Sequence, residues 1–468
     1  MQNAQYDFGL IGLGVMGRNF ILNVADHGFS AFGYDLDREK VDALKAEGGD
    51  LKKVDATQDL ANFVQALRSP RKIMLLVPAG KIVDQVIDQL LPHLDQGDII
   101  IDGGNSFFTD TDRRDAYLSE KGIHFFGSGV SGGAKGARRG PSIMPGGNRE
   151  AYEHVRPIFE AVSAKYQGEP CVAYLGPKSA GNYVKMVHNG IEYAMMQLTS
   201  EVYDLLHRAG GLSNDELHQV FDSWNKGRLQ SFLVEITAEI FLKEDDLGTG
   251  RLVDVILDKA KQKGTGKWTS QNAMDLGIPV PTIDMAVSMR EISALKADRE
   301  KADALYTRPE LPGLEKAELI ASCEEALYFA FIISYTQGLH QLAAASQEYG
   351  YELNLSQIAK IWRAGCIIRA GLLADIAEAF EENSRLENLL LAPAFVEKVQ
   401  KTLPAVRKTA IQALERGIAM PGLMTAISYF DAFTSGRLPL NLIQAQRDHF
   451  GSHTYERTDR EGIFHTEW

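Results

Sequence analysis

The chain contains only three cysteines in 468 residues, Cys171, Cys323 and Cys366, and their spacing fits no metal-binding motif. The N-terminus lacks the basic segment of a secretory signal, and no stretch approaches the roughly 20 apolar residues of a membrane span. The chain also has fewer basic than acidic residues: 49 lysines and arginines against 62 aspartates and glutamates, which give a net charge of −13. These absences argue against a metal site, a membrane role and nucleic acid as a partner, and they predict a cytoplasmic protein.

The length and the pattern of apolar residues predict two folded regions and a tail. At about 150 residues per domain, 468 residues correspond to two to three domains. Up to residue 177, strand-like apolar runs alternate with helical segments, as in a doubly wound parallel sheet. The runs are Asp7–Ile11, Ser30–Asp35, Lys72–Val77, Asp98–Asp102, His124–Gly127 and Cys171–Leu175. We predict a Rossmann-like α/β domain over 1–177, an all-helical domain over 178–437 and a C-terminal tail over 438–468.

The first strand is followed by a glycine motif. Gly12-Leu13-Gly14-Val15-Met16-Gly17 has the G-x-G-x-x-G spacing and leads into an apolar-periodic helix from Asn19. Such glycines permit a tight turn and the close approach of a pyrophosphate, which the helix N-terminus then binds. A purely structural glycine turn is the alternative, but the strand, turn and helix context favours dinucleotide binding.

A second glycine-rich region covers Gly129-Val130-Ser131-Gly132-Gly133 and Gly140–Gly147. A loop this rich in glycine exposes backbone N–H groups, which suit a carboxylate or phosphate ligand. A mobile linker is the alternative, although apolar Ile143 and Met144 between the glycines favour a packed turn.

One helical face carries an unusual set of polar side chains. Lys185, His188, Asn189 and Glu192 stand at i, i+3, i+4 and i+7, and therefore point to the same side of a helix. Burying such a stripe is costly unless a polar ligand pairs with it. A solvated face with ion pairs is the alternative, and the two glycine-rich regions favour one wall of an active site.

The helical half contains signs of an internal repeat. Caps such as Ser213 and Asn354 begin helices that lead to Trp224-x-x-Gly227 and Trp362-x-x-Gly365. After Leu438-Pro439 one short amphipathic stretch precedes a polar, glycine-interrupted end that composition alone predicts to be frayed.

Taken together, these segments resemble one family, the 6-phosphogluconate dehydrogenases, along the whole chain. Further segments that match the family pattern are Ile101–Asn105, Lys263–Thr269, Ala364–Arg369 and Ala445–Tyr455. The last three do not occur in generic dehydrogenases, so the resemblance is specific. It implies oxidative decarboxylation of 6-phosphogluconate to ribulose 5-phosphate in the pentose phosphate pathway.

The resemblance also implies the catalytic roles. Lys185 matches the family's general base, and burial can lower the pKa of such a lysine enough for it to be neutral near pH 7. Glu192 matches the acid that delivers a proton to the enediol, while His188 and Asn189 match residues that orient the substrate and the lysine. No metal is needed, because the β-keto group of the oxidised substrate is itself the electron sink.

By the same resemblance, two sets of residues bind the two ends of the substrate. The carboxylate end is expected at Asn105, Ser131, Gly132 and Gly133. The phosphate end is expected at Tyr193, Lys263, Thr265, Arg290 and Arg447, with His453 supplied by the tail of a partner subunit in a homodimer. Arginine forks suit phosphate and backbone N–H groups suit carboxylate.

The dinucleotide is expected to contact Gly12 to Gly17, Asp35, Leu36, Asp37, Val77 and Asn105. Members that use NADP carry an arginine after the second strand, where this chain has Asp35-Leu36-Asp37. A carboxylate there prefers a free ribose hydroxyl and repels a 2′-phosphate. Pro78 also stands where the family often has lysine, so the sequence favours NAD over NADP, with Arg38 and Lys40 near enough to oppose this.

Two other functions remain open on the sequence. A 3-hydroxyisobutyrate-type dehydrogenase would share the glycine loop and the Lys185 and Asn189 pair, but it would be shorter and would lack Glu192 and the Lys263 and Arg447 segments. A catalytically silent NAD-binding sensor would be expected to have lost Lys185 or Glu192, and both are present.

Overall fold

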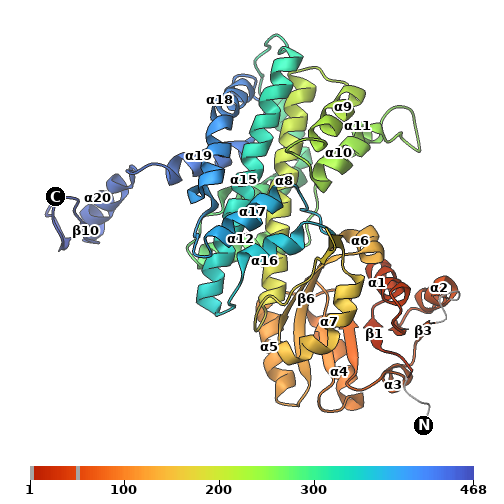
Figure 1. Ribbon diagram of the computed structural model, residues 1–468. Helices are drawn as coiled ribbons and strands as arrows, with labels where there is room; N and C mark the ends of the chain where they lie inside the picture. The colour runs from red at the N-terminus through yellow and green to blue at the C-terminus, as the bar shows by residue number, and fades with distance from the viewer. Residues whose placement is uncertain (1–4, 49–52) are drawn as a thin grey trace.

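The computed structural model describes residues 5–48 and 53–468. Figure 1 shows a sheet region near the N-terminus, a body of long helices above it and a C-terminal arm that extends away from that body. Residues 1–4 and 49–52 fall within the predicted dinucleotide domain and lie outside the described residues.

A seven-stranded sheet forms the N-terminal region, in the order β3-β2-β1-β4-β5-β6-β7. Its strands are β1 (Phe8–Ile11), β2 (Ala31–Tyr34), β3 (Val54–Thr57), β4 (Lys72–Leu75), β5 (Ile99–Asp102), β6 (His124–Ser131) and β7 (Ser142–Gly147). All neighbours pair in parallel except β6 and β7, which are antiparallel. From β1 the chain adds β2 and β3 on one side and β4 onward on the other, so the strand order reverses between β1 and β4. Sheets of this type bind ligands in the crevice beyond the carboxyl ends of the two strands at this point.

Helices cover both faces of the sheet and bury its apolar side chains. They are α1 (Val15–Asp26), α2 (Arg38–Gly48), α3 (Leu60–Gln65), α4 (Lys81–Leu90), α5 (Phe108–Ser119), α6 (Gly133–Arg139) and α7 (Arg149–Val162), with a 3-10 turn at Leu91–His93. Alternate strand residues point to opposite faces, so Leu10 joins the core under α1 and α7 while Ile11 joins the core under α3 and α4. This explains the continuous apolar runs in the sequence.

Several predicted elements of this region need correction. The strand expected at Cys171–Leu175 is wrong, because the segment follows a short hairpin, β8 (Lys165–Tyr166) and β9 (Glu169–Pro170), and bridges β7 only at Val172. The helix after the glycine motif begins at Val15, not at Asn19. Strand β3 was not anticipated from the sequence.

The second glycine-rich region is a pair of strands and not mainly a loop. Its glycines let helix α8 (Ala180–Arg208) lie directly on β6 and β7. A Cβ added at Gly129 would stand 2.4 Å from Cβ of Lys185, and one at Gly146 would stand 2.3 Å from the backbone nitrogen of Gly181. The glycines therefore serve close packing of the helix that carries the predicted catalytic residues.

The remainder of the body is helical, as predicted. It comprises α8, α9 (Asn214–Asn225), α10 (Phe232–Leu242), α11 (Leu252–Val255), α12 (Thr265–Asp275), α13 (Pro281–Ala294), α14 (Lys296–Leu305), α15 (Lys316–Tyr349), α16 (Leu355–Trp362), α17 (Leu372–Glu382), α18 (Pro393–Glu415) and α19 (Pro421–Phe433), with a 3-10 turn at Leu389–Leu391. Ser213 forms the expected capping box with Glu216, and Asn354 caps α16. The long helices α8 and α15 pack together at the centre (Figure 1).

The two halves of the helical body correspond to the predicted repeat. Each long helix is followed by a short one that ends at the tryptophan motif, α9 at Trp224 and α16 at Trp362. The segments after the two motifs meet at an antiparallel bridge between Ser231 and Ala370. The two equivalent turns thus contact each other.

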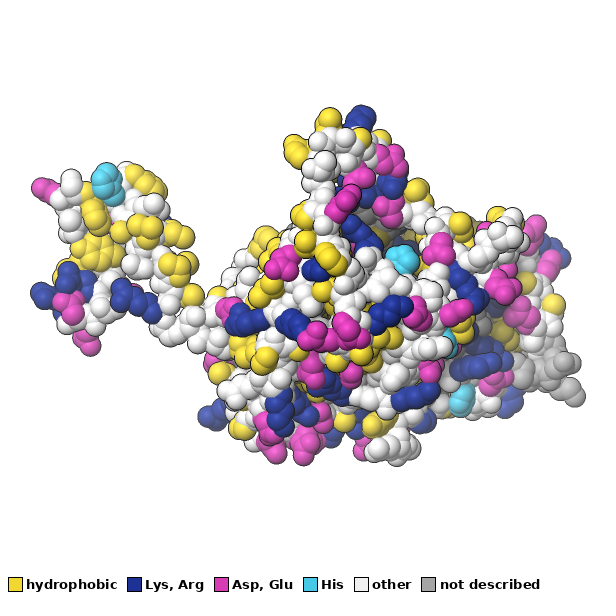
Figure 2. Space-filling model, turned by 90° about the horizontal axis from the view of Figure 1, so that it is seen from above, with side chains coloured by type: hydrophobic (Ala, Val, Ile, Leu, Met, Phe, Trp, Pro, Cys, Tyr) yellow, Lys and Arg dark blue, Asp and Glu magenta, His cyan; other side chains and the backbone are white. Residues whose placement is uncertain are grey.

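The C-terminal arm is folded, contrary to the frayed end that composition predicts. Helix α20 (Leu440–Gly451) is followed by a hairpin of β10 (Tyr455–Glu456) and β11 (Ile463–Phe464). The buried carboxylate of Asp448 accepts hydrogen bonds from the backbone of Thr454 and Thr466 and from the indole of Trp468, and pairs with His465. Figure 2 shows apolar side chains gathered on this arm.

Within residues 5–48 and 53–468, no helix is long and apolar enough to cross a membrane. The same residues contain no group of three or more His, Cys, Asp and Glu side chains arranged to hold a metal ion. All three cysteines are buried and free.

Candidate active site

The predicted polar face of α8 is buried and its side chains contact one another. Lys185 is 6% exposed and His188 is fully buried. Lys185 Nζ lies 3.4 Å from His188 Nδ1, which in turn lies 3.1 Å from Asn189 Oδ1. A carboxylate oxygen of Glu192 lies 3.9 Å from the same ring nitrogen. The alternative of a solvated helix face is therefore wrong.

Residues from three other elements complete this wall. Ser131, at the end of β6, has its hydroxyl 3.2 Å from His188 Nε2 and accepts a hydrogen bond from the backbone N–H of Ile367. Asn189 donates to the hydroxyl of Thr265, the first residue of α12, at 3.1 Å. These contacts hold the histidine and the amide in fixed orientations.

Burial sets the ionisation of the three titratable groups on this face. It lowers the pKa of Lys185, even though the nearby carboxylate of Glu192 opposes the shift. Burial also raises the pKa of Glu192 against the effect of Lys185 and Arg290, and burial together with Lys185 brings the pKa of His188 well below its usual value. Burial therefore shifts the pKa values of Lys185 and Glu192 toward each other, and favours the neutral form of each side chain.

A cation lies at the far end of the face. The guanidinium of Arg290, on α13, stacks 3.5 Å from the ring centre of Tyr193 and donates to the backbone oxygen of Lys261. No carboxylate of the described residues lies within ion-pair distance of it. An arginine positioned without an acidic partner suits an anionic ligand.

The opposite side of the site is a cavity of about 720 Å³ at the crevice between β1 and β4. Its lining includes the glycine loop, the segments Leu76–Gly80 and Gly103–Asn105, and Lys263 and Trp268 of the helical body. This volume lies within the range of small-molecule and cofactor sites.

The glycine loop fits a dinucleotide. Gly12 has φ +100°, and a Cβ added at Gly17 would stand 1.9 Å from the backbone oxygen of Gly12, so both positions require glycine. Gly14, by contrast, faces open space and begins α1, whose first turn has neither a side-chain cap nor an acidic residue. Its free N–H groups can therefore bind a pyrophosphate.

Comparison with known proteins decides the family. The model described as "NAD binding domain of 6-phosphogluconate dehydrogenase" matches residues 7–176, and that described as "6-phosphogluconate dehydrogenase, C-terminal domain" matches residues 181–468. The chain belongs to the 6-phosphogluconate dehydrogenase family. The resemblance inferred from the sequence is thereby confirmed.

Individual relatives cover almost the whole chain. The 6-phosphogluconate dehydrogenase, NADP(+)-dependent, decarboxylating, of Bacillus subtilis is 52% identical over 467 residues, 99% of each chain. The decarboxylating 6-phosphogluconate dehydrogenase of Escherichia coli K12 is 50% identical over 467 residues, again 99% of each. The solved structure of 6-phosphogluconate dehydrogenase from Plasmodium falciparum, studied in its apo form and in complexes with NADP+ and 6-phosphogluconate, has a TM-score of 0.95 at 45% identity and covers 99% of this chain and 100% of that one.

Membership of the 6-phosphogluconate dehydrogenase family makes the chain a decarboxylating oxidoreductase with a nicotinamide dinucleotide cofactor. The full-length matches at 50–52% identity favour this over a 3-hydroxyisobutyrate-type dehydrogenase. They do not distinguish NAD from NADP in this chain.

Two of the predicted phosphate-end residues lie away from this site. Arg447 is on α20, where it donates to Gln444, and His453 follows that helix in the same arm. Figure 1 shows this arm extending away from the body. From the sequence only His453 was expected to come from a partner subunit, but Arg447 lies on the same arm.

Several of the other predicted residues border the cavity or the polar face of α8, whereas Asp35, Leu36 and Asp37 are not in the cavity lining. Asn105, Val77 and Lys263 border the cofactor cavity. Gly132 and Gly133 begin α6 with positive φ, and a Cβ added at Gly132 would stand 2.4 Å from the backbone oxygen of Gly365.

Sequence reasoning missed the role of the segment around Gly365. The N–H of Ile367 binds Ser131, and the indole ring of Trp362 meets the His188 ring edge-on at 5.6 Å between centres. A hydrogen bond from a backbone N–H does not depend on the residue type, so it cannot be predicted from the amino acid at that position. Only the match of Ala364–Arg369 to the family pattern indicated this segment.

Proposed function

We propose that this enzyme converts 6-phospho-D-gluconate to D-ribulose 5-phosphate and CO2 as part of the pentose phosphate pathway, with NAD+ as its preferred oxidant. The observation that carries the proposal is the buried Lys185, His188 and Glu192 face of α8 beside the dinucleotide cavity. The bound dinucleotide supplies a hydride acceptor, and the chain supplies the proton transfers.

In the oxidation, Lys185 in its neutral form takes the proton of the C3 hydroxyl while the C3 hydride leaves. The lowered pKa of Lys185 supports this role, because a base must be unprotonated before it acts. Neutral His188 holds the lysine amine at 3.4 Å and orients it toward the substrate.

In the decarboxylation, the protonated Lys185 donates to the C3 ketone oxygen as the bond between C1 and C2 breaks and CO2 departs. The electron pair of that bond forms the enediol. Glu192 then delivers a proton to C2 of the enediol, which becomes C1 of ribulose 5-phosphate, while the C3 hydroxyl returns its proton to Lys185 and the ketone forms. The raised pKa of Glu192 supports its protonated state before this step.

The substrate spans the site from carboxylate to phosphate. We assign the carboxylate to Asn105, Ser131 and the N–H groups of Gly132 and Gly133, with Asn189 beside them. We assign the phosphate to Tyr193, Lys263, Thr265 and Arg290 of one subunit and to Arg447 and His453 of the partner. The unpaired guanidinium of Arg290 supports the phosphate end.

Initial rates with 6-phosphogluconate, with either NAD+ or NADP+, test the reaction. We expect one CO2 and one ribulose 5-phosphate per reduced dinucleotide. Oxidation without CO2 release would contradict the decarboxylating mechanism.

The preference for NAD+ rests on the end of β2. Asp35 accepts a hydrogen bond from the backbone of Leu13 at 2.8 Å, so its carboxylate is held beside the glycine loop. The two nearby cations are paired with acids, Arg38 with Asp42 at 2.9 Å and Lys40 with Asp35 at 3.6 Å. A 2′-phosphate would meet acids and no free arginine. The name of the Bacillus subtilis relative, NADP(+)-dependent, makes this the feature most in need of a test.

We expect kcat/KM to favour NAD+ by roughly tenfold or more, because a missing charged hydrogen bond costs about 1.5–3 kcal/mol and about 1.4 kcal/mol corresponds to a factor of ten. The triple variant Asp35→Asn, Leu36→Arg, Asp37→Ser should move the preference toward NADP+. Asp88→Asn, at an exposed acid on α4, is the control for the loss of an acidic side chain elsewhere on the domain and should leave the ratio unchanged. Equal or higher kcat/KM with NADP+ in the unmodified enzyme would contradict the proposal.

We further propose that the enzyme is a homodimer in which each arm completes the partner's site. The arm exposes apolar side chains that a monomer would leave in water: Leu440, Leu442, Ile443, Phe450 and Trp468 are 52–73% exposed. Arg447 lies on α20 and His453 follows it, and this arm extends away from the body that contains α8, the helix of Lys185 (Figure 1). Both features support docking on a second copy.

Subunit mixing tests this arrangement. Lys185→Ala and His453→Ala chains should each be nearly inactive, and after subunit exchange a heterodimer should regain activity at the one site that holds both side chains. A mixture of Lys185→Ala and Glu192→Gln chains is the matched control and should stay inactive, because both residues belong to the same chain's body. Absence of recovery in the first mixture, despite proven exchange, would show that the arm does not complete a partner's site.

A further inference from the structure

Helix α5 carries a buried arginine toward the cofactor cavity. Arg114 has a side chain only 1% exposed, although it lies in a helix whose sequence is mostly polar. A buried guanidinium is costly unless all its donors find acceptors, so its partners indicate what it does.

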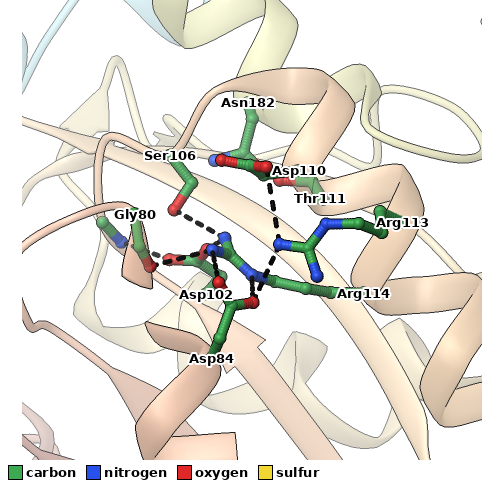
Figure 3. A network of polar contacts seen from close by, with 10 residues as sticks. Gly80, Asp84, Asp102, Ser106, Asp110, Thr111, Arg113, Arg114 and Asn182 are labelled. Carbon is green, nitrogen blue, oxygen red and sulfur yellow. Dashed lines mark hydrogen bonds and ion pairs between the residues drawn. The ribbon is translucent and has the colours of Figure 1, made fainter. Parts of the chain in front are cut away.

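Arg114 contacts four separate groups around it (Figure 3). Its Nε donates to Asp84 on α4 at 2.8 Å, and one terminal nitrogen donates to the backbone oxygen of Gly80 at 3.0 Å. The other terminal nitrogen lies 3.3 Å from the hydroxyl of Ser106 and 3.5 Å from the carboxylate of Asp102. One side chain thus bridges the segment before α4 and the segment after β5.

These two segments form one wall of the cofactor cavity. Val77 to Gly80 follow β4, and Gly103 to Asn105 follow β5. Asp102 is fully buried and also accepts a hydrogen bond from the N–H of Gly104 at 3.0 Å. Asp102 therefore connects Arg114 to the turn that contains Asn105. Arg114 itself is not among the residues that line the cavity.

We propose that Arg114 is a positioning residue for the bound dinucleotide, which fixes the spacing between the β4–α4 loop and the β5–α5 loop. The inference rests on the proposed dinucleotide-dependent reaction and extends it to a residue outside the site. A planar guanidinium is required because a lysine ammonium cannot reach Asp84, Gly80 and Ser106 together.

Helix α5 also contacts the start of α8, the helix that carries Lys185 and Glu192. Thr111 donates to the side chain of Asn182 at 3.1 Å, one turn before Lys185, and Asp112 accepts from the backbone and hydroxyl of Ser179. Helix α5 therefore connects the cofactor loops at one side to the start of α8 at the other, and Arg114 acts on the cofactor side.

The test compares neighbouring arginines that share Asp84. Arg114→Lys should weaken binding of NAD+ and NADP+, measured by calorimetry without substrate, by about tenfold or more, since it removes several charged hydrogen bonds from the loops. The KM for the dinucleotide should rise in parallel. Arg113→Lys is the matched control: Arg113 donates to Asp84 from the solvent side with a 56% exposed side chain, and binding should change by less than about twofold.

Thermal unfolding separates positioning from support of the fold. An Arg114→Lys enzyme that unfolds at lower temperature but binds dinucleotide within about twofold of the unmodified enzyme would overturn the inference. If Arg114→Lys does not accumulate as folded protein, the test uses Ser106→Ala instead, which removes a single contact of Arg114. Ser106→Ala should weaken dinucleotide binding about threefold, and unchanged dinucleotide binding would likewise overturn the inference. An unmodified enzyme that binds dinucleotide but does not oxidise 6-phosphogluconate would contradict the proposed function and leave this inference standing.

Discussion

Replacing Lys185 with alanine is expected to abolish oxidation of 6-phosphogluconate and to leave dinucleotide binding intact. Lys185 lies on α8 with a pKa lowered by burial, whereas the glycine loop that fits the dinucleotide belongs to the sheet. General-base catalysis contributes about 10² to 10⁴ in rate, so turnover should fall at least that far. Steady-state rates and calorimetric binding of the dinucleotide measure the two effects separately.

Lys226→Ala is the control for this variant, because Lys226 is 73% exposed and its one ion pair among the described residues is with Asp222. Its activity should equal that of the unmodified enzyme. Retention of more than about a tenth of turnover by Lys185→Ala would be incompatible with its role as the base.

The pH dependence follows from the same lowered pKa. Lys185 acts as a base only when unprotonated, so kcat/KM should rise with pH as this group loses its proton, and the lowered pKa moves that rise to a lower pH than for an ordinary lysine. A rise that persists unchanged in a residually active Lys185 variant would assign it to another group.

Glu192→Gln is the second substitution with a large expected effect. The amide keeps the shape of the side chain but cannot deliver a proton to the enediol, so turnover should fall by about 10² or more. Because burial raises the pKa of Glu192, the unmodified enzyme keeps its acid protonated to a higher pH than an exposed glutamate would. The loss of that proton should appear as an alkaline limb in the pH profile of kcat, and the limb should be absent from Glu192→Gln.

Glu239→Gln, an exposed position on α10, controls for the change of charge and should be without effect. Product analysis by chromatography accompanies the rates. Near-normal turnover of Glu192→Gln with ribulose 5-phosphate as product would show that a different group is the acid.

The sequence predicted the parts of this molecule that rest on local periodicity. The i, i+3, i+4, i+7 spacing from Lys185 to Glu192 is a property of any helix, so their shared face could be predicted without the fold. The glycine motif was likewise predictable, because the turn at Gly12 and the packing at Gly17 require glycine itself.

Features that depend on distant contacts could not be predicted in this way. Strand β7 contains Pro145, Gly146 and Gly147, which are poor strand formers, and it exists because α8 packs closely against it. Arg114 lies in a polar helix and would be taken for a surface charge, yet its partners at Gly80 and Asp84 come from another part of the chain. The contact of Ile367 with Ser131 spans 236 residues and uses only a backbone N–H.

The internal hydrogen bonds of the arm bear on the proposed association of two chains. Asp448 joins helix α20 to the backbone beyond the hairpin and to the terminal Trp468, so the segment holds its shape through contacts of its own. A segment that is ordered before docking loses little conformational entropy when it binds, whereas a disordered tail would lose much. In the proposed dimer, association of two chains through this arm would therefore resemble the fitting of two rigid bodies, and Arg447 and His453 would reach the partner's site already fixed in position.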